Sequence, residues 1–391
     1  MTAAPQATSP QTSAADTTTP APAPSQARSE RSSGAGFRLV FLVPGAVALL
    51  AGLDAALLLL GLWAPIRSDR LPEVHGIVMV LGFVGTLISL ERAIALGRLW
   101  GYLAPAGLGA GALLLVSPAP VAVGHTALVV GAAALTAVYV PLWRRQRDDA
   151  VLVQAMGAAL ATGAAAILAA GAAVPDVLGW LVGFVVLTIA GERLELARIS
   201  MGAQAPATLV ALAALLVAGV VALLLWPAVG AAFLGLALAL LTGWLALHDV
   251  ARVTIRSTGL PRYMAVCMML AYAWLGVAAA IWLVSGPVHE GPAYDALLHA
   301  VFLGFTVSMV MAHAPVILPA VLRRPLPYHP LLFVPVGLLH ASLVLRIWIG
   351  DGLGHPDAVT LGGVLNIVSV LTFIVLAAAS ATGLLSPRRN P

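Results

Sequence analysis

Long apolar segments follow one another along most of the chain, each of about twenty residues and separated by short polar connectors. A helix of that length crosses a hydrocarbon core of about 30 Å, so each segment predicts a transmembrane span. Two connectors, Ser117-Pro118-Ala119-Pro120 and Pro227, are very short, and proline ends a helix at such places. The pattern predicts twelve spans, at residues 37–63, 74–97, 101–119, 121–143, 150–172, 175–196, 206–226, 228–247, 263–285, 293–322, 329–349 and 358–386.

The residues outside these segments define the domain organisation. Residues 1–36 are almost wholly Ala, Pro, Ser, Thr and Gln, with no apolar periodicity, which is typical of a disordered tail. They lack the apolar core of a cleavable signal peptide. We therefore expect a disordered cytoplasmic tail at 1–36, one transmembrane domain at 37–386 and a short cytoplasmic C-terminal tail at 387–391.

The composition excludes a soluble globular domain. Of 391 residues, 61% are hydrophobic and 9% are charged, and the mean hydropathy is +1.00. A soluble chain of this size could not cover that much apolar surface with polar groups. Cys267 is the single cysteine and lies in an apolar segment, which rules out an intrachain disulfide and leaves a thiolate metal cluster without support.

Arginine alone predicts the orientation, because the chain has no lysine. If the spans alternate in direction, 17 arginines fall on the side of the N-terminal tail and three on the other side, Arg67, Arg70 and Arg346. The positive-inside rule then predicts that both termini are cytoplasmic, in a cell inner (cytoplasmic) membrane. The net charge of +4 therefore reflects topology, and no nucleic-acid partner is expected.

Spans two, six and ten repeat one pattern. Each contains a Gly-Phe pair, at Gly82-Phe83, Gly183-Phe184 and Gly304-Phe305, with a polar residue eight positions after the phenylalanine. Those polar residues are Glu91, Glu192 and His313. Four spans per repeat preserve the direction across the membrane, so the pattern predicts three successive units of four helices.

This organisation resembles two known families. Twelve spans in three four-helix arcs resemble subunit I of the heme-copper oxidases, although the paired-histidine signatures of the oxidases are absent. Two short motifs resemble the NnrS family of heme- and copper-containing membrane proteins, whose span-two motif is His-x-His-Glu-Met-x-x-Gly. Here Ile77 stands at the second histidine, and the Arg and Gly-His-Thr-Gly-Arg tail of span ten is missing. The matching segments read His75-Gly76-Ile77-Val78-Met79-Val80-Leu81-Gly82 and His299-Ala300-Val301-Phe302-Leu303-Gly304.

These resemblances imply an all-α polytopic membrane protein with about twelve helices in three arcs. They also imply heme b and copper as cofactors, and an oxidoreductase role in nitric oxide metabolism or respiratory electron transfer. The partners they imply are the lipid bilayer, a small gaseous substrate, and an electron-donor protein or quinone.

His75 and His299 are the candidate heme ligands. Both lie near the start of spans that run in the same direction, so they share a depth in the membrane. Histidine within a span is costly and usually functional, and neutral imidazole is a common heme ligand. In an α-helix, His75 would share one face with Met79, Gly82 and Thr86, and the small residues would leave room for a porphyrin. Residues at the same end that could orient these histidines are Glu73, Glu290 and Asp295.

One observation counts against a symmetric pair. His75 precedes its glycine by seven residues and His299 by five, and two residues turn an α-helix by about 200°.

Three further histidines are candidate metal ligands. His313 lies fourteen residues after His299, about 21 Å further along the helix, which suits a second site or a proton-carrying group. An alternative role for His313 is a hydrogen bond at the kink before Pro315. His340 lies near the middle of span eleven and His125 at the start of span four.

Two acid-base pairs, Glu91-Arg92 and Glu192-Arg193, end spans two and six. We interpret them as a structural charge layer in which each glutamate pairs with its adjacent arginine and joins neighbouring arcs. The alternative is a proton path or a metal site.

Two other classes of function fit the sequence. One is a transporter or channel built from repeats, although a threefold repeat of even period differs from the inverted pair of many transporters. The other is a structural subunit of a respiratory complex with inert histidines.

Overall fold

The computed structural model describes residue 2, residues 24–322 and residues 325–385, and these are helical apart from short connectors. We number the spans in chain order. Spans one to six consist of α1 (Pro24–Leu59); α2 (Arg70–Ile77), η1 (Val78–Val84) and α3 (Gly85–Leu96); η2 (Leu99–Tyr102) and α4 (Leu103–Val116); α5 (Val121–Gln146); α6 (Asp149–Ala169); and η3 (Val174–Val177) with α7 (Leu178–Met201). Spans seven to twelve consist of α8 (Ala205–Leu225); α9 (Pro227–His248); α11 (Gly259–Ser285); α12 (Gly291–His299), η4 (Ala300–Val307) and α13 (Ser308–Leu322); η5 (Pro330–Leu332), α14 (Phe333–Leu343) and η6 (Val344–Gly352); and α15 (Pro356–Ala381). The short α10 (Ala251–Thr254) lies in the connector between spans eight and nine.

The fold class and the number of spans are confirmed. Twelve of the described helical stretches are long and apolar enough to cross a membrane, and no strand occurs among the described residues. The two proline connectors end helices as predicted, since α4 stops at Val116 and α9 begins at Pro227. The chain is therefore an all-α polytopic membrane protein.

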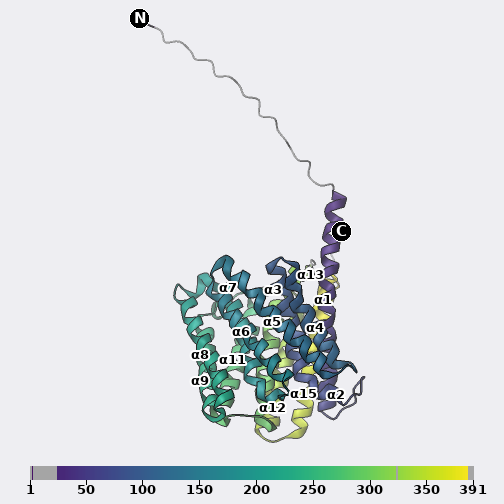
Figure 1. Cartoon of the computed structure of the whole chain (residues 1–391), viewed down its shortest axis with the longest axis vertical. Helices are drawn as coiled ribbons and strands as arrows, with labels where there is room; N and C mark the ends of the chain where they lie inside the picture. Colours follow the sequence, from purple (N-terminus) through teal and green to yellow (C-terminus); the bar gives the residue numbers. More distant parts are fainter. Residues whose placement is uncertain (1, 3–23, 323–324, 386–391) are drawn as a thin grey trace.

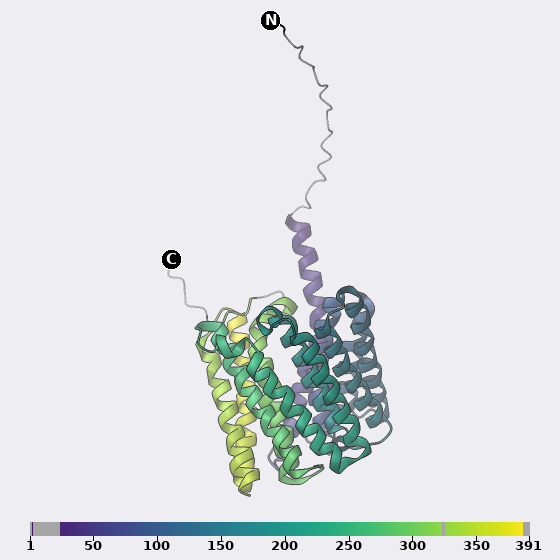
Figure 2. The same cartoon turned by 90° about the vertical axis from the view of Figure 1, so that its left-hand side faces the viewer.

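The predicted N-terminal tail is wrong in part, and the remainder of both predicted tails lies outside the described residues. Helix α1 begins at Pro24, inside the predicted tail, and its first part extends beyond the bundle as a rod (Figures 1 and 2). Residues 1 and 3–23 and the tail at 387–391 lie outside the described residues.

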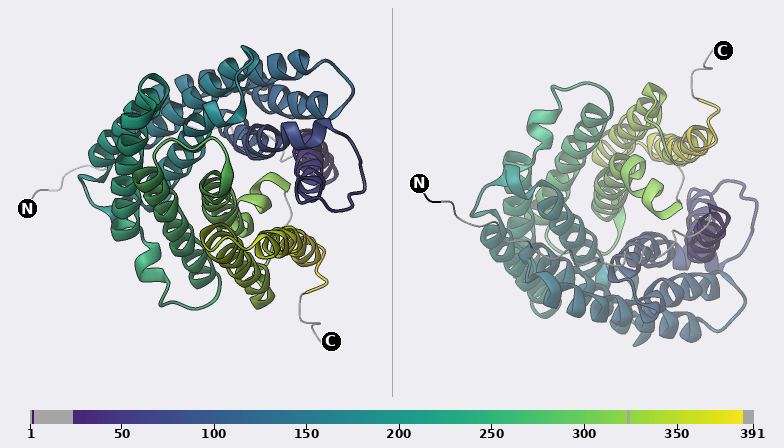
Figure 3. Two further views of the ribbon diagram at one scale, coloured as in Figure 1. Left: turned by 90° about the horizontal axis from the view of Figure 1, so that it is seen from below. Right: turned by 90° about the horizontal axis from the view of Figure 1, so that it is seen from above.

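The three spans that share the repeated pattern are the most buried ones. In their most apolar windows, spans two and six are 78% buried and span ten is 67% buried, whereas the other nine range from 28% to 56%. The spans follow chain order around the molecule, so the first and last lie near each other (Figure 3). The spans that carry the Gly-Phe pair are therefore the inner ones, one in each group of four.

Glycine permits a close helix contact between α4 and α5. A Cβ on Gly107 would lie 2.6 Å from the Cα of Gly131, and one on Gly131 would lie 2.4 Å from the backbone nitrogen of Leu108. Small residues let membrane helices approach closely, which strengthens packing where lipid provides no hydrophobic driving force.

Among the described residues, three spans contain a π-helical segment, η1, η4 and η6. A π-helix has hydrogen bonds five residues apart and more residues per turn than an α-helix. The expected small-residue face of span two is therefore wrong: Gly82 packs against Ala48 of α1 and Ala112 of α4. Likewise Gly304 packs against Trp274 of α11. The 200° argument against pairing His75 with His299 fails for the same reason, because it assumed α-helical geometry throughout.

Candidate functional site

A cavity of about 430 Å³ lies between the inner spans two, six and ten and the outer spans one, eleven and twelve. It lies toward the end where span one stops and where spans two and ten begin, the lower end in Figure 1. We call this the arginine-poor end, and the opposite end the arginine-rich end. The wall is mostly apolar, and each of the three π segments contributes to it, for example through Met79, Phe302 and Arg346. Such segments occur frequently at functional sites.

His75 and His299 both line this cavity. The Nδ1 of His75 lies 2.9 Å from the carbonyl oxygen of Gly52 in α1, a partner that fixes the tautomer with the proton on Nδ1. Among the described residues, no hydrogen bond reaches the Nε2 of His75. The structure therefore brings the two predicted ligands together and gives His75 a free lone pair.

His299 is held in the same way, with an added carboxylate. Its Nδ1 lies 2.8 Å from the carbonyl oxygen of Asp295 and 3.3 Å from the Asp295 carboxylate. Arg346 donates from Nε and Nη2 to both oxygens of that carboxylate, each at 2.8 Å. Metal-binding histidines usually donate their second ring N–H to a carbonyl or carboxylate, which orients the ring. Of the three acidic residues expected to orient ligands, Asp295 does so.

One further polar atom in the cavity wall lacks a partner. Asn366 lines the cavity, and its Oδ1 accepts a hydrogen bond of 2.5 Å from Ser342. Its Nδ2 is buried and has no hydrogen-bond partner among the described residues. A buried donor without a partner is costly, and this one belongs to a residue of the cavity wall.

The lining fits a heme group. The volume is within the range of cofactor pockets, about 300–1,000 Å³, and the apolar wall suits a flat macrocycle. Two imidazoles with fixed tautomers line the wall and would hold its iron. The polar groups Tyr294, Asp295 and Arg346 gather at the arginine-poor end, where charged substituents of such a cofactor would reach water.

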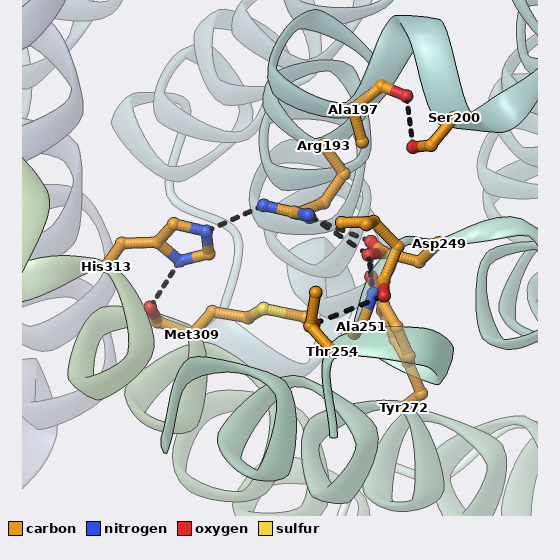
Figure 4. A network of polar contacts seen from close by, with 10 residues as sticks. Arg193, Ala197, Ser200, Asp249, Ala251, Thr254, Tyr272, Met309 and His313 are labelled. Carbon is orange, nitrogen blue, oxygen red and sulfur yellow. Dashed lines mark hydrogen bonds and ion pairs between the residues drawn. The ribbon is translucent and has the colours of Figure 1, made fainter. Parts of the chain in front are cut away.

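His313 belongs to a separate network at the arginine-rich end (Figure 4). Its Nδ1 donates to the Met309 carbonyl at 2.7 Å, and its Nε2 accepts from Nη1 of Arg193 at 3.1 Å. Neither nitrogen then keeps a lone pair for a metal. His313 is thus a hydrogen-bond partner between spans six and ten, at the position of the layer that we predicted.

Asp249 completes this network. It accepts hydrogen bonds from Nε and Nη2 of Arg193 at 2.8 and 3.0 Å, from the Tyr272 hydroxyl at 2.7 Å, and from the Ala251 N–H at 2.8 Å (Figure 4). Burial alone would raise the pKa of the Asp249 carboxyl, but the hydrogen bonds and charge of Arg193 outweigh it, so the pKa lies below its ordinary value.

His340 and His125 make no hydrogen bond to one another or to His313 within the described residues. The Nδ1 of His340 accepts from the Trp274 indole at 2.8 Å, and its Nε2 lies 3.4 Å from the Ser308 hydroxyl. The Nε2 of His125 is buried without a partner among the described residues. No group of three or more His, Cys, Asp or Glu side chains that could hold a metal occurs in the part of the chain described. A metal at His340 or His125 stays a prediction.

Arg92 forms a second joint at the arginine-rich end. It donates to Glu91 at 2.6 Å, to Glu195 of α7 at 3.3 Å and to Gln154 of α6 at 3.1 Å. Arg92 and Arg193 thus each connect one inner span to the next. Both arginines therefore join neighbouring inner spans, as the interpretation of a structural charge layer predicted.

The expected pairing of Glu192 with Arg193 is wrong. Arg193 bonds to Asp249 and His313, and the Oε1 of Glu192 is buried without a partner within the described residues. Adjacent residues on a helix point about 100° apart, so a pair in sequence need not be a pair in space.

Sequence reasoning missed four residues of these networks. Arg346 could have been found from the sequence, because it is one of the three arginines on the arginine-poor side of the membrane. It also lies within a span, where ionisable residues are usually functional. Asp249, Glu195 and Gln154 carried only a weak signal, because they lie at or near span ends, where polar residues are ordinary.

Comparison with known proteins identifies a family for this chain, but the description of that family names no activity. Residues 38–382, which contain all twelve spans, match a family model described as Domain of unknown function (DUF8744). No curated protein matches the chain.

Proposed function

The chain belongs to the family described as Domain of unknown function (DUF8744), and from the geometry of its cavity we propose that it is a membrane protein that binds heme b. His75 and His299 would hold the iron. The observation that supports this proposal is that two inner-span histidines line one apolar cavity, each with Nδ1 held by a carbonyl oxygen.

Ligation by two histidines favours electron transfer among the expected roles. A heme held by His75 and His299 would supply one-electron chemistry, and each histidine would give one nitrogen to the iron. Binding of nitric oxide or another gas would require one histidine to leave. We therefore propose respiratory electron transfer, with an electron-donor protein or quinone as partner at the arginine-poor end.

This chain's own residues would tune such a group. The carboxylate of Asp295 raises the electron density of the His299 ring, while Arg346 holds the carboxylate in place. The apolar wall from η1 and η4 excludes water, and a low-polarity surrounding shifts the potential of a bound metal centre.

We expect the protein purified from heme-replete cells to contain about one heme b per chain. Pyridine hemochrome analysis measures the content, and the reduced-minus-oxidised optical spectrum reports two nitrogen ligands. A colourless, metal-free preparation would contradict the proposal and would favour a transporter or a structural subunit.

We further propose that the arginine-rich end faces the cytoplasm of a cell with the protein in its inner membrane. Reporter fusions after Arg147 and Arg256 are expected to be active in the cytoplasm, and a fusion in the loop 288–292 outside it. Both loops that carry the first two fusions follow even-numbered spans. A cytoplasmic signal from the loop 288–292 would reverse the orientation.

A further inference from the structure

A group of polar atoms without partners lies beside the joint made by Arg92. Within the described residues, no hydrogen bond reaches Nε of Arg92, the hydroxyl of Tyr139 or Oε1 of Glu192. The Tyr139 side chain is 1% exposed, and its hydroxyl interacts electrostatically with Arg92, Glu192, Glu91 and Glu195. Buried polar groups are normally satisfied, so this cluster requires an occupant that the side chains alone do not provide.

The charges around Glu192 leave an excess of carboxylates. Glu91 and Arg92 of α3 face it, with Glu195 on its own helix, and Gln154 of α6 adds no charge. The other nearby cation, Arg193, is neutralised by Asp249. Arg198, further along α7, pairs with Asp148. Three carboxylates therefore share one available guanidinium.

Burial distinguishes the three carboxylates. The side chains of Glu91 and Glu195 are 28% and 38% exposed, and both bond to Arg92, so water and the guanidinium stabilise their charge. Glu192 as a whole is half-buried, but its Oε1 is enclosed and has no hydrogen-bond partner within the described residues. A buried carboxylate without a partner takes up a proton instead of remaining charged.

We propose that Glu192 is a proton-binding site that exchanges with solvent at the arginine-rich end. One proton passes from water to the exposed Glu195 carboxylate and on to Glu192, which becomes a neutral carboxylic acid next to the Tyr139 hydroxyl. Arg92 disfavours a metal cation at the same place by repulsion. The site is separate from the cavity and does not depend on heme.

Infrared spectroscopy of the full-length protein tests this site. At neutral pH the wild type is expected to show the carbonyl band of a protonated carboxylic acid, which disappears in Glu192→Gln and changes frequency in Tyr139→Phe. The control Glu73→Gln, an exposed residue at the opposite end, should keep the band. Absence of the band from the wild type, or an unchanged band in Glu192→Gln, would overturn the proposal.

Stability provides a second readout. A neutral Glu192 makes no ion pair, so Glu192→Gln should unfold in detergent at the wild-type temperature at neutral pH. A clear loss of stability in Glu192→Gln would mean that this carboxylate is ionised and paired, contrary to the proposal.

Discussion

Replacement of His299 or His75 with glycine is expected to remove the heme from the purified protein. Each imidazole would provide one axial nitrogen, and loss of a residue that merely orients a ligand already weakens metal binding by about 10–100-fold. We expect the loss of a ligand to have at least that effect. The heme content per chain of the two variants, measured after purification, checks this result.

Imidazole in the buffer separates ligation from a structural role. A glycine leaves a space of the side chain's shape, and free imidazole that fills it should restore the heme content and the spectrum. His289→Ala is the control, because His289 is exposed and lies at the same end, outside the cavity. Full heme content in both glycine variants without imidazole would rule out these residues as ligands.

Asp249→Asn is expected to cost about 3–5 kcal/mol of stability, because it leaves the buried guanidinium of Arg193 without its carboxylate. Asparagine keeps the shape of the side chain, so the loss reports the charge. Unfolding in detergent, by heat or by dodecyl sulfate, measures the change.

The exposed ion pair of Arg198 with Asp148 is the control. The Arg198 side chain is 56% exposed, and replacing it with glutamine should cost less than about 1 kcal/mol. Equal losses in Arg198→Gln and Asp249→Asn would contradict the structural role of the buried pair.

The lowered pKa of Asp249 also fixes a pH dependence. The folded-state value lies below the unfolded value of about 3.9, so the stabilisation is fully present above that pH. It is lost as the pH falls through the lower, folded-state value. The difference in stability between wild type and Asp249→Asn should therefore persist from neutral pH down to about pH 4.

The positions of the spans and the likeness among spans two, six and ten could be predicted from the sequence, because both depend on features that recur along the chain. Apolar length sets the spans, and the Gly-Phe pair recurs on the three most buried ones. The π segments could not be predicted, since an altered hydrogen-bond spacing leaves an apolar segment apolar. Their effect is large: Gly82, expected to face the cofactor, contacts Ala48 and Ala112 instead.

The candidate site was predictable in part. His75 and His299 are rare polar residues inside spans, and the cost of burying them directs attention to them. Their setting depends on residues distant in sequence, such as the carbonyl of Gly52 and the guanidinium of Arg346. Glu192 shows the opposite case, because its neighbour Arg193 suggested a partner that the helix geometry places elsewhere.

The walls of the cavity include both the first and the last span, through Leu53 of α1 and Ile367 of α15. These helices are made at opposite ends of translation. During synthesis the pocket therefore stays open on one side until α15 has entered the bilayer. Closure of the pocket therefore waits for α15, and a chain that lacks this helix has no wall on that side of the pocket.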